Sequence, residues 1–316
     1  MSFSKIGALR YEFERGIIPE LTSCPGFYCG RTKFLDGNWS ECGGCARGYR
    51  RNDNIDKYAC VPCDQDLNLY AWLYLGFMAI LPLLLHFTFT DRKILKSSRN
   101  TIGLVICAVL EVATAGAITL LLWEPVGQFQ VKFCGVESLS DWYPIFYNPN
   151  PNYEETLHCS YEAVYPLYTI VLVFYALADV LMVFVRLIAR CFKIKVAKSI
   201  YSGLYFYPML ALGHLMFGGL VYSVFPYITI VTSVVSCAYH FASRSNQTIK
   251  ALLWESISDW RNIGVIFCHW FLHAYGIASI TENLYRDLYL LVLVPVPAIL
   301  YILTASFTDP NKVNGE

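Results

Sequence analysis

The sequence TIGLVICAVLEVATAGAITLLLW occupies residues 101–123, and Glu111 is its one charged side chain. A bilayer core about 30 Å thick is crossed by about 20 predominantly apolar residues of helix. Because lipid offers no hydrogen-bond partners, the backbone of such a segment must satisfy its own polar groups, as an α-helix does. Residues 101–123 are therefore predicted to form a transmembrane helix.

Six further stretches have the same apolar character. The whole chain is 56% hydrophobic and 15% charged, whereas soluble domains are about 25% charged. The sequence therefore predicts an all-α polytopic membrane protein with about seven transmembrane helices. Pro226, among aromatic neighbours, predicts a tight turn between the fourth and fifth spans. The other six spans are 67–90, 164–188, 200–222, 225–241, 263–280 and 288–307, and kinks are expected at Pro82, Pro208, Pro295 and Pro297.

Basic residues indicate how the chain is oriented. Lysine and arginine gather after the first, third and fifth spans, whereas the alternate connections hold little more than Lys132 and Arg286. Because basic loops stay in the cytosol, we expect a luminal cysteine-rich domain at 1–66, a transmembrane domain at 67–307 and a short cytosolic tail at 308–316. The basic clusters are Arg92, Lys93, Lys96 and Arg99; Arg186, Arg190, Lys193, Lys195 and Lys198; and Arg244, Lys250 and Arg261.

Six cysteines lie in the predicted luminal domain, within the motifs CPGFYCG, CGGC and CVPC. Two C-x-x-C pairs are typical of a zinc site, whereas an even cysteine count in a short segment is typical of disulfides in an oxidising compartment. The luminal orientation and the glycosylation sequon at Asn38 favour disulfides, although the sequence does not choose their pairing. The six residues are Cys24, Cys29, Cys42, Cys45, Cys60 and Cys63.

The connection between the second and third spans carries two more cysteines, Cys134 and Cys159. This connection lies on the same predicted luminal side as the head. We therefore expect a further disulfide from these two residues, with two unpaired thiols as the alternative.

Ionisable side chains near the middle of predicted spans are candidates for function, because charge is costly in lipid. His269 and His273 are four residues apart and share one helical face. With another histidine and a carboxylate they form the ligand set of an intramembrane zinc hydrolase, which is one hypothesis. A proton or ion relay through paired acids is a second, and polar packing between helices is a third. The five residues are Glu111, Asp179, His214, His269 and His273.

Residues 249–261 repeat apolar side chains at helical spacing, with charged residues on the other face. This pattern predicts an amphipathic helix on the cytosolic membrane surface, or an extension of the sixth span. Balanced charge, 24 basic and 24 acidic residues, gives no reason to expect nucleic acid as a partner.

Three motifs carry a family resemblance: CPGFYCGR at 24–31, GNWSECGGCARGYR at 37–50 and YACVPCD at 58–64. Joined to a body of about seven spans, they resemble the c-Jun N-terminal kinase-associated membrane protein family over essentially the whole chain. The resemblance implies a non-enzymatic adaptor of the endoplasmic reticulum membrane, without a cofactor. Its implied partners are membrane ubiquitin ligases, proteasome subunits and a stress-activated kinase.

A kinase-docking surface is the matching expectation for the cytosolic side. Such sites place basic residues before alternating apolar ones, and residues 190–196 fit this pattern loosely; the alternative is an ordinary basic loop. A composite surface that includes residues 244–262 is the better hypothesis. The expected surface comprises Arg190, Lys193, Ile194, Val196, Leu253, Trp254 and Trp260.

Overall fold

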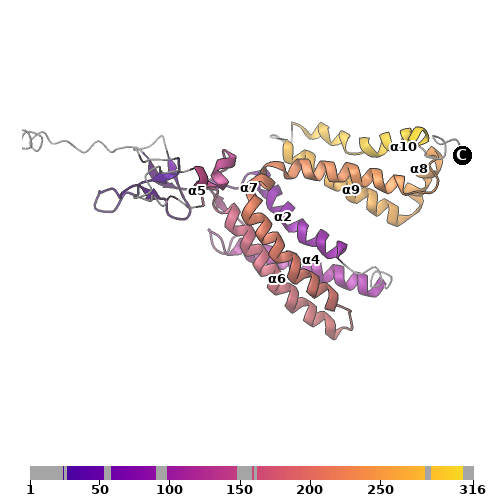
Figure 1. Ribbon diagram of the computed structural model, residues 1–316, viewed down its shortest axis with the longest axis horizontal. Helices are drawn as coiled ribbons and strands as arrows, with labels where there is room; N and C mark the ends of the chain where they lie inside the picture. Colours follow the sequence, from indigo (N-terminus) through magenta and orange to yellow (C-terminus); the bar gives the residue numbers. More distant parts are fainter. Residues whose placement is uncertain are drawn as a thin grey trace, which may run out of the picture. The chain divides into compact units, whose positions relative to one another are not determined.

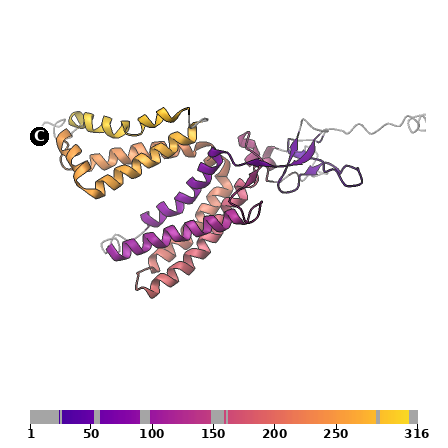
Figure 2. The same cartoon turned by 180° about the vertical axis from the view of Figure 1, so that it is seen from behind.

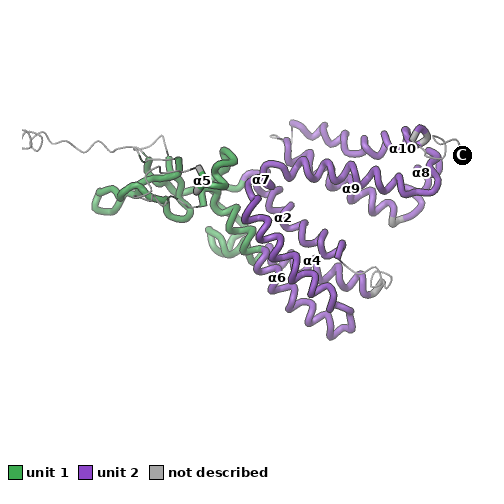
Figure 3. Tube along the Cα trace, in the orientation of Figure 1, with its two compact units in different colours: residues 1–67, 117–174 green, residues 68–116, 175–316 purple. Residues whose placement is uncertain are grey.

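The computed structural model describes residues 24, 27–52, 58–89, 98–147, 159, 162–281 and 286–308. The chain divides into two compact units, which are described separately (Figure 3). Unit 1 comprises residues 1–67 and 117–174, and unit 2 comprises residues 68–116 and 175–316. The predicted domain limits at 66 and 307 remain predictions, but unit 1 adds residues 117–174 to the predicted head.

Unit 1 contains three short antiparallel strand pairs. β1 (Cys29–Gly30) pairs with β2 (Gly43–Gly44), β3 (Tyr49–Asn52) with β4 (Ala59–Pro62), and β5 (Gln65–Asp66) with β6 (Lys132–Phe133). A 3₁₀ helix, η1 (Leu139–Trp142), and the short α5 (Pro144–Tyr147) follow β6. Strands this short bury little apolar surface, so the unit depends on covalent crosslinks.

All eight cysteines predicted to form disulfides are paired: Cys24 with Cys42, Cys45 with Cys60, Cys29 with Cys159, and Cys63 with Cys134. The expected disulfide between Cys134 and Cys159 is therefore wrong. The β5–β6 register explains the difference, because it pairs Gln65 with Phe133 and so brings Cys134 beside Cys63. The loop that follows α4 (Ser98–Leu121) is thus crosslinked to the head rather than to itself.

The described residues contain six helices that are long and apolar enough to cross a membrane. They begin with α2 (Leu69–Thr88), α4 and α6 (Leu167–Cys191). α7 (Ala197–Ala242) follows, then α9 (Trp260–Ile280), and last a span made of the 3₁₀ helix η2 (Leu288–Leu293) and α10 (Val296–Thr308). The break between η2 and α10 includes Pro295, and Pro297 is the second residue of α10; kinks were predicted at both prolines. The short α8 (Ile249–Ser258) precedes α9.

The tight turn predicted at Pro226 is wrong, because α7 runs through it without interruption and joins the predicted fourth and fifth spans. A helix of 46 residues is about 69 Å long at about 1.5 Å per residue, roughly twice the thickness of a bilayer core. Both ribbon views show α7 changing direction in its middle part (Figures 1 and 2). The helix therefore has the length and the bend to supply two spans.

Tyrosine hydroxyls compensate for two prolines inside these helices. A proline lacks the N–H that would bond to the carbonyl four residues earlier. For Pro226 that carbonyl belongs to Tyr222, and it accepts a hydrogen bond of 2.6 Å from the Tyr70 hydroxyl of α2. For Pro82 of α2 it belongs to Met78, and it accepts a bond of 3.2 Å from the Tyr175 hydroxyl of α6. The proline sites are thus also places where neighbouring helices are joined.

Candidate functional site

The most deeply buried charges of unit 2 form an ion pair between α4 and α6. Arg186 Nε lies 2.8 Å from Glu111 Oε1, and Arg186 Nη2 lies 3.0 Å from Glu111 Oε2. Both side chains are 0% exposed. This bidentate contact aligns the planar guanidinium with the carboxylate and fixes the orientation of both side chains. The pair therefore sets the register of α4 against α6.

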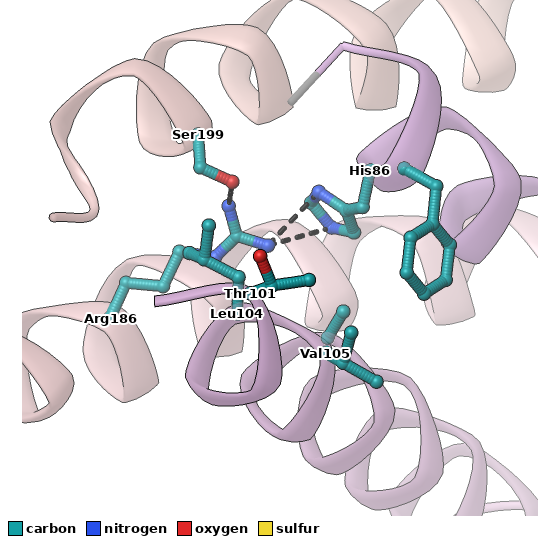
Figure 4. A pocket seen from close by; sticks show the side chains of 8 residues that line it. His86, Thr101, Leu104, Val105, Arg186 and Ser199 are labelled. Atoms are coloured by element: carbon teal, nitrogen blue, oxygen red, sulfur yellow. Dashed lines mark hydrogen bonds between the residues drawn. The ribbon is translucent and has the colours of Figure 1, made fainter. Parts of the chain in front are cut away.

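Two further helices join this polar cluster, which we define as His86, Glu111, Arg186 and Ser199; Figure 4 shows His86, Arg186 and Ser199. Arg186 Nη2 lies 2.9 Å from Nδ1 and 3.1 Å from Nε2 of His86, which comes from α2. Arg186 Nη1 donates to the hydroxyl of Ser199, which comes from α7. Because a guanidinium only donates hydrogen bonds, the imidazole nitrogen that receives its bond acts as an acceptor.

The polar cluster borders a cavity of about 10 Å³, which is about the space of one water molecule. Apolar side chains, among them Leu104 and Val105, make up much of the rest of its wall. A cavity of this size has no room for a substrate beside the ion pair. The arrangement therefore joins four helices.

The sequence argument found only one member of this polar cluster. Glu111 was predicted to face the bundle interior, but Arg186 was assigned to a cytosolic basic cluster, and its complete burial corrects this assignment. Residue 186 lies inside the predicted span 164–188, and a buried acid requires a partner; those two facts together were the available signal. Nothing in the sequence singled out His86 or Ser199.

The hydrogen bonds described for the other predicted intramembrane polar residues are made outside the polar cluster. His214 Nδ1 is 3.3 Å from the Tyr74 hydroxyl, and His269 Nδ1 is 3.0 Å from Ser236 Oγ. His273 is buried. One carboxylate oxygen of Asp179 is buried without a hydrogen bond in the described part of the chain.

These positions bear on the zinc-hydrolase hypothesis. Among the described residues, no three His, Cys, Asp or Glu side chains lie close enough together to hold a metal ion. His214, His269 and His273 all belong to the described residues. They are therefore not brought together with a carboxylate as that hypothesis requires.

The predicted kinase-docking residues divide into exposed and packed ones. Arg190 and Lys193 are exposed at the end of α6. Val196 is 4% exposed and, with Ile194, packs in a cluster that includes Leu104 of α4. The alternating apolar pair of the docking pattern is thus used for helix packing, whereas the basic residues stay accessible together with Cys191 and Phe192.

The predicted amphipathic helix is present as α8, which ends at Ser258, three residues before the predicted end at 261. Leu252 is buried, whereas Leu253 and Trp254 are exposed. The side chain of Trp260 and the tail at 309–316 lie outside the described residues. Leu253 and Trp254 therefore remain candidates for a cytosolic interaction surface.

The head contains its own buried network. The Tyr28 hydroxyl donates to Asp141 Oδ1 over 2.9 Å, and Arg50 lies 3.3 Å from Asp141 Oδ2. Burial, helped by the negative charge of Asp141, raises the pKa of Tyr28 to about 12. Asn38 is exposed, and its side chain donates to Asp36. The sequon is therefore accessible, and its glycosylation remains a prediction.

Comparison with known proteins identifies the family. The family model described as "JNK1/MAPK8-associated membrane protein" matches residues 24–310, which is most of the chain. The chain belongs to this family. Relatives in the JNK1/MAPK8-associated membrane protein family from Mus musculus and Homo sapiens are each 44% identical to it over 306 residues, covering 93% of this chain and 96% of theirs.

A more distant member of the JNK1/MAPK8-associated membrane protein family is the homolog from Caenorhabditis elegans. It is 31% identical over 313 residues, covering 92% of this chain and 94% of its own. No solved structure matches the chain. The resemblance expected from the head motifs is confirmed, and it extends through the membrane helices.

Proposed function

We propose that the chain is an adaptor of the endoplasmic reticulum membrane that binds a stress-activated kinase on its cytosolic side and modulates JNK signalling. The observation that carries this proposal is the 44% identity, over 93% of the chain, to relatives whose name states an association with JNK1/MAPK8. The closed polar cluster supports a scaffold rather than an enzyme, since its charged groups are used to join helices.

The sidedness of the adaptor is part of the proposal. Four disulfides suit the oxidising lumen of the reticulum, and the basic ends of the helices suit the cytosol. The N-terminal head is then luminal, and the C-terminus is cytosolic. On the cytosolic side the adaptor would also bring membrane ubiquitin ligases and proteasome subunits to misfolded proteins, as the family resemblance implies.

Kinase binding is tested by purifying the tagged full chain from cells in mild detergent and measuring co-purified JNK1. We expect Arg190→Glu with Lys193→Glu to lower kinase recovery, because both side chains are exposed beside the membrane end of α6. The control is Lys33→Glu, which makes the same change of charge at one exposed residue of the head. If no kinase co-purifies with the unmodified chain, this part of the proposal is rejected.

The degradation partners are tested in the same preparation by mass spectrometry for ubiquitin-ligase and proteasome subunits. Their absence, with the kinase present, would confine the function to signalling. The luminal head is tested by endoglycosidase treatment, which should increase mobility of the unmodified chain and leave Asn38→Gln unchanged. A chain that is insensitive to the enzyme and has free head thiols would reject the orientation.

A further inference from the structure

An apolar groove of about 470 Å³ lies within unit 2, between α8, α9 and α10. From α9 it is lined by Ile263, Ile266, Phe267 and Trp270, which recur every three or four residues and so form one face. These positions extend over about 10 Å of helix at about 1.5 Å per residue. The groove is thus short and follows the axis of a helix that is a candidate membrane span.

α10 and Pro295, which directly precedes it, supply another wall. Pro295, Ala298, Ile299 and Ile302 lie at intervals of three or four residues and also form one face. Ala298 and Ile302 belong at the same time to a buried cluster with Leu252 of α8. The floor of the groove is therefore well packed, while Ile299 and Phe267 stay exposed at its rim.

α8 borders the groove with Leu253, Ser256 and Ile257. Two lining residues carry a polar group: Trp270 has an indole N–H, and the hydroxyl of Ser256 donates to the Leu252 carbonyl over 2.6 Å, while the surface that faces the groove is apolar. The lining therefore offers a ligand apolar contacts. A volume of this order is typical of small-ligand sites.

α8 carries one exposed lysine on the face that borders the groove. Lys250 is exposed and lies three residues before Leu253 and seven before Ile257, so it shares their face of α8. Glu255, an acid of the same helix, lies 4.0 Å from Arg244, and Asp259 caps the far end of α8, nine residues from Lys250. An apolar groove along two membrane helices, with an ammonium group near its end, is complementary to an acyl chain that carries an anionic head.

The size of the groove favours an acyl chain over a helix of a partner protein. An α-helix with its side chains is about 10–12 Å across, so it could not enter a groove about 10 Å long that α8 borders. A single extended hydrocarbon chain is much thinner. We propose that the groove binds one acyl chain of an anionic phospholipid, whose phosphate contacts Lys250.

The proposal is tested on the full chain in phosphatidylcholine vesicles that contain a minor fraction of lipid with brominated acyl chains. Bromine quenches tryptophan fluorescence at short range, and Trp270 lines the groove. We expect brominated phosphatidylserine to quench Trp270 at about one fifth of the concentration that brominated phosphatidylcholine requires, given the attraction of one lysine for an anionic head group.

Variants show which tryptophan gives the quenching signal and which residue gives the lipid preference. Trp270→Phe should remove the selective quenching, whereas Trp254→Phe should keep it, because Trp254 is exposed on α8 and does not line the groove. Lys250→Ala should abolish the preference for phosphatidylserine, and Lys250→Arg should retain it. Equal quenching by the two lipids, no quenching of Trp270, or a preference that survives Lys250→Ala would each overturn the proposal.

Discussion

The Tyr70 hydroxyl donates a hydrogen bond of 2.6 Å to the carbonyl of Tyr222, the group that Pro226 leaves without its helical partner. The bend of α7 and the packing of α2 against it are therefore one arrangement. The rings add to this contact, since Tyr70 and Tyr222 meet edge to face with centroids 4.9 Å apart. A proline that would weaken an isolated helix here provides an attachment point.

Tyr70→Phe should lower stability in detergent by about 1 kcal/mol or somewhat more, because it leaves a buried carbonyl unsatisfied. In a Pro226→Ala background the alanine N–H can bond to Tyr222, so the same substitution should cost much less. Unfolding in a detergent mixture measures this double-mutant cycle. Tyr239→Phe, at an exposed tyrosine of α7, is the control, and equal costs in both backgrounds would contradict the assignment.

Removing either charge from the ion pair in the polar cluster should be severely destabilising. Arg186→Met leaves Glu111 buried and uncompensated, and losses of this kind are about 3–5 kcal/mol. Combining it with Glu111→Leu should recover part of the loss, since no charge then remains. Arg190→Met, one turn later on α6 and exposed, should be nearly neutral. The measurement is again unfolding in detergent, and additive losses in the double variant would disprove the pairing.

Two glycines of α9 should respond to alanine in opposite directions. A Cβ on Gly276 would lie 2.9 Å from the Pro226 carbonyl oxygen and 2.6 Å from Thr229 Oγ1, so the two helices would have to separate. A Cβ on Gly264 would meet nothing within 4 Å. Gly264→Ala should therefore stabilise the helix by up to about 1 kcal/mol, whereas Gly276→Ala should lower the melting temperature. The same sign for both variants would reject this packing.

The disulfides of the head should be reduced in an order set by access to solvent. Cys63 and Cys134 line an open cavity of about 360 Å³ and should be reduced first. Cys29 and Cys159 are 0% and 2% exposed and should be reduced last. Stepwise reduction, alkylation and peptide mass spectrometry give the order. Early labelling of Cys29 would contradict the burial of that bond.

Local patterns predicted the parts of the fold that depend on local sequence. The hydrophobic stretch at 101–123 predicted α4, and the period of residues 249–261 predicted α8. Pro226 was misread because proline favours a turn in isolation, and the hydroxyl that rescues the helix comes from Tyr70, 152 residues away in sequence. That compensation depends on tertiary packing, which no local pattern encodes.

In the candidate site, too, local sequence revealed some residues, whereas others depend on tertiary packing. Glu111 stood out because an acid within an apolar stretch is conspicuous, whereas Arg186 was hidden among the basic residues expected at the end of α6. Ile194 and Val196 fitted a docking pattern but pack against α4, since their order along the chain does not reveal which neighbour they meet. The pairing of Cys134 with Cys63 likewise required the register of β5 with β6.

The bonds from Cys29 to Cys159 and from Cys63 to Cys134 join positions 130 and 71 residues apart. The N-terminal head is made first on the ribosome, yet it acquires its last two covalent links only after the sequences of α2, α4 and the loop beyond have been synthesised. Nascent chains that stop earlier lack the native partners of Cys29 and Cys63. Completion of these two bonds thus requires that synthesis has passed α4 and the loop that follows it.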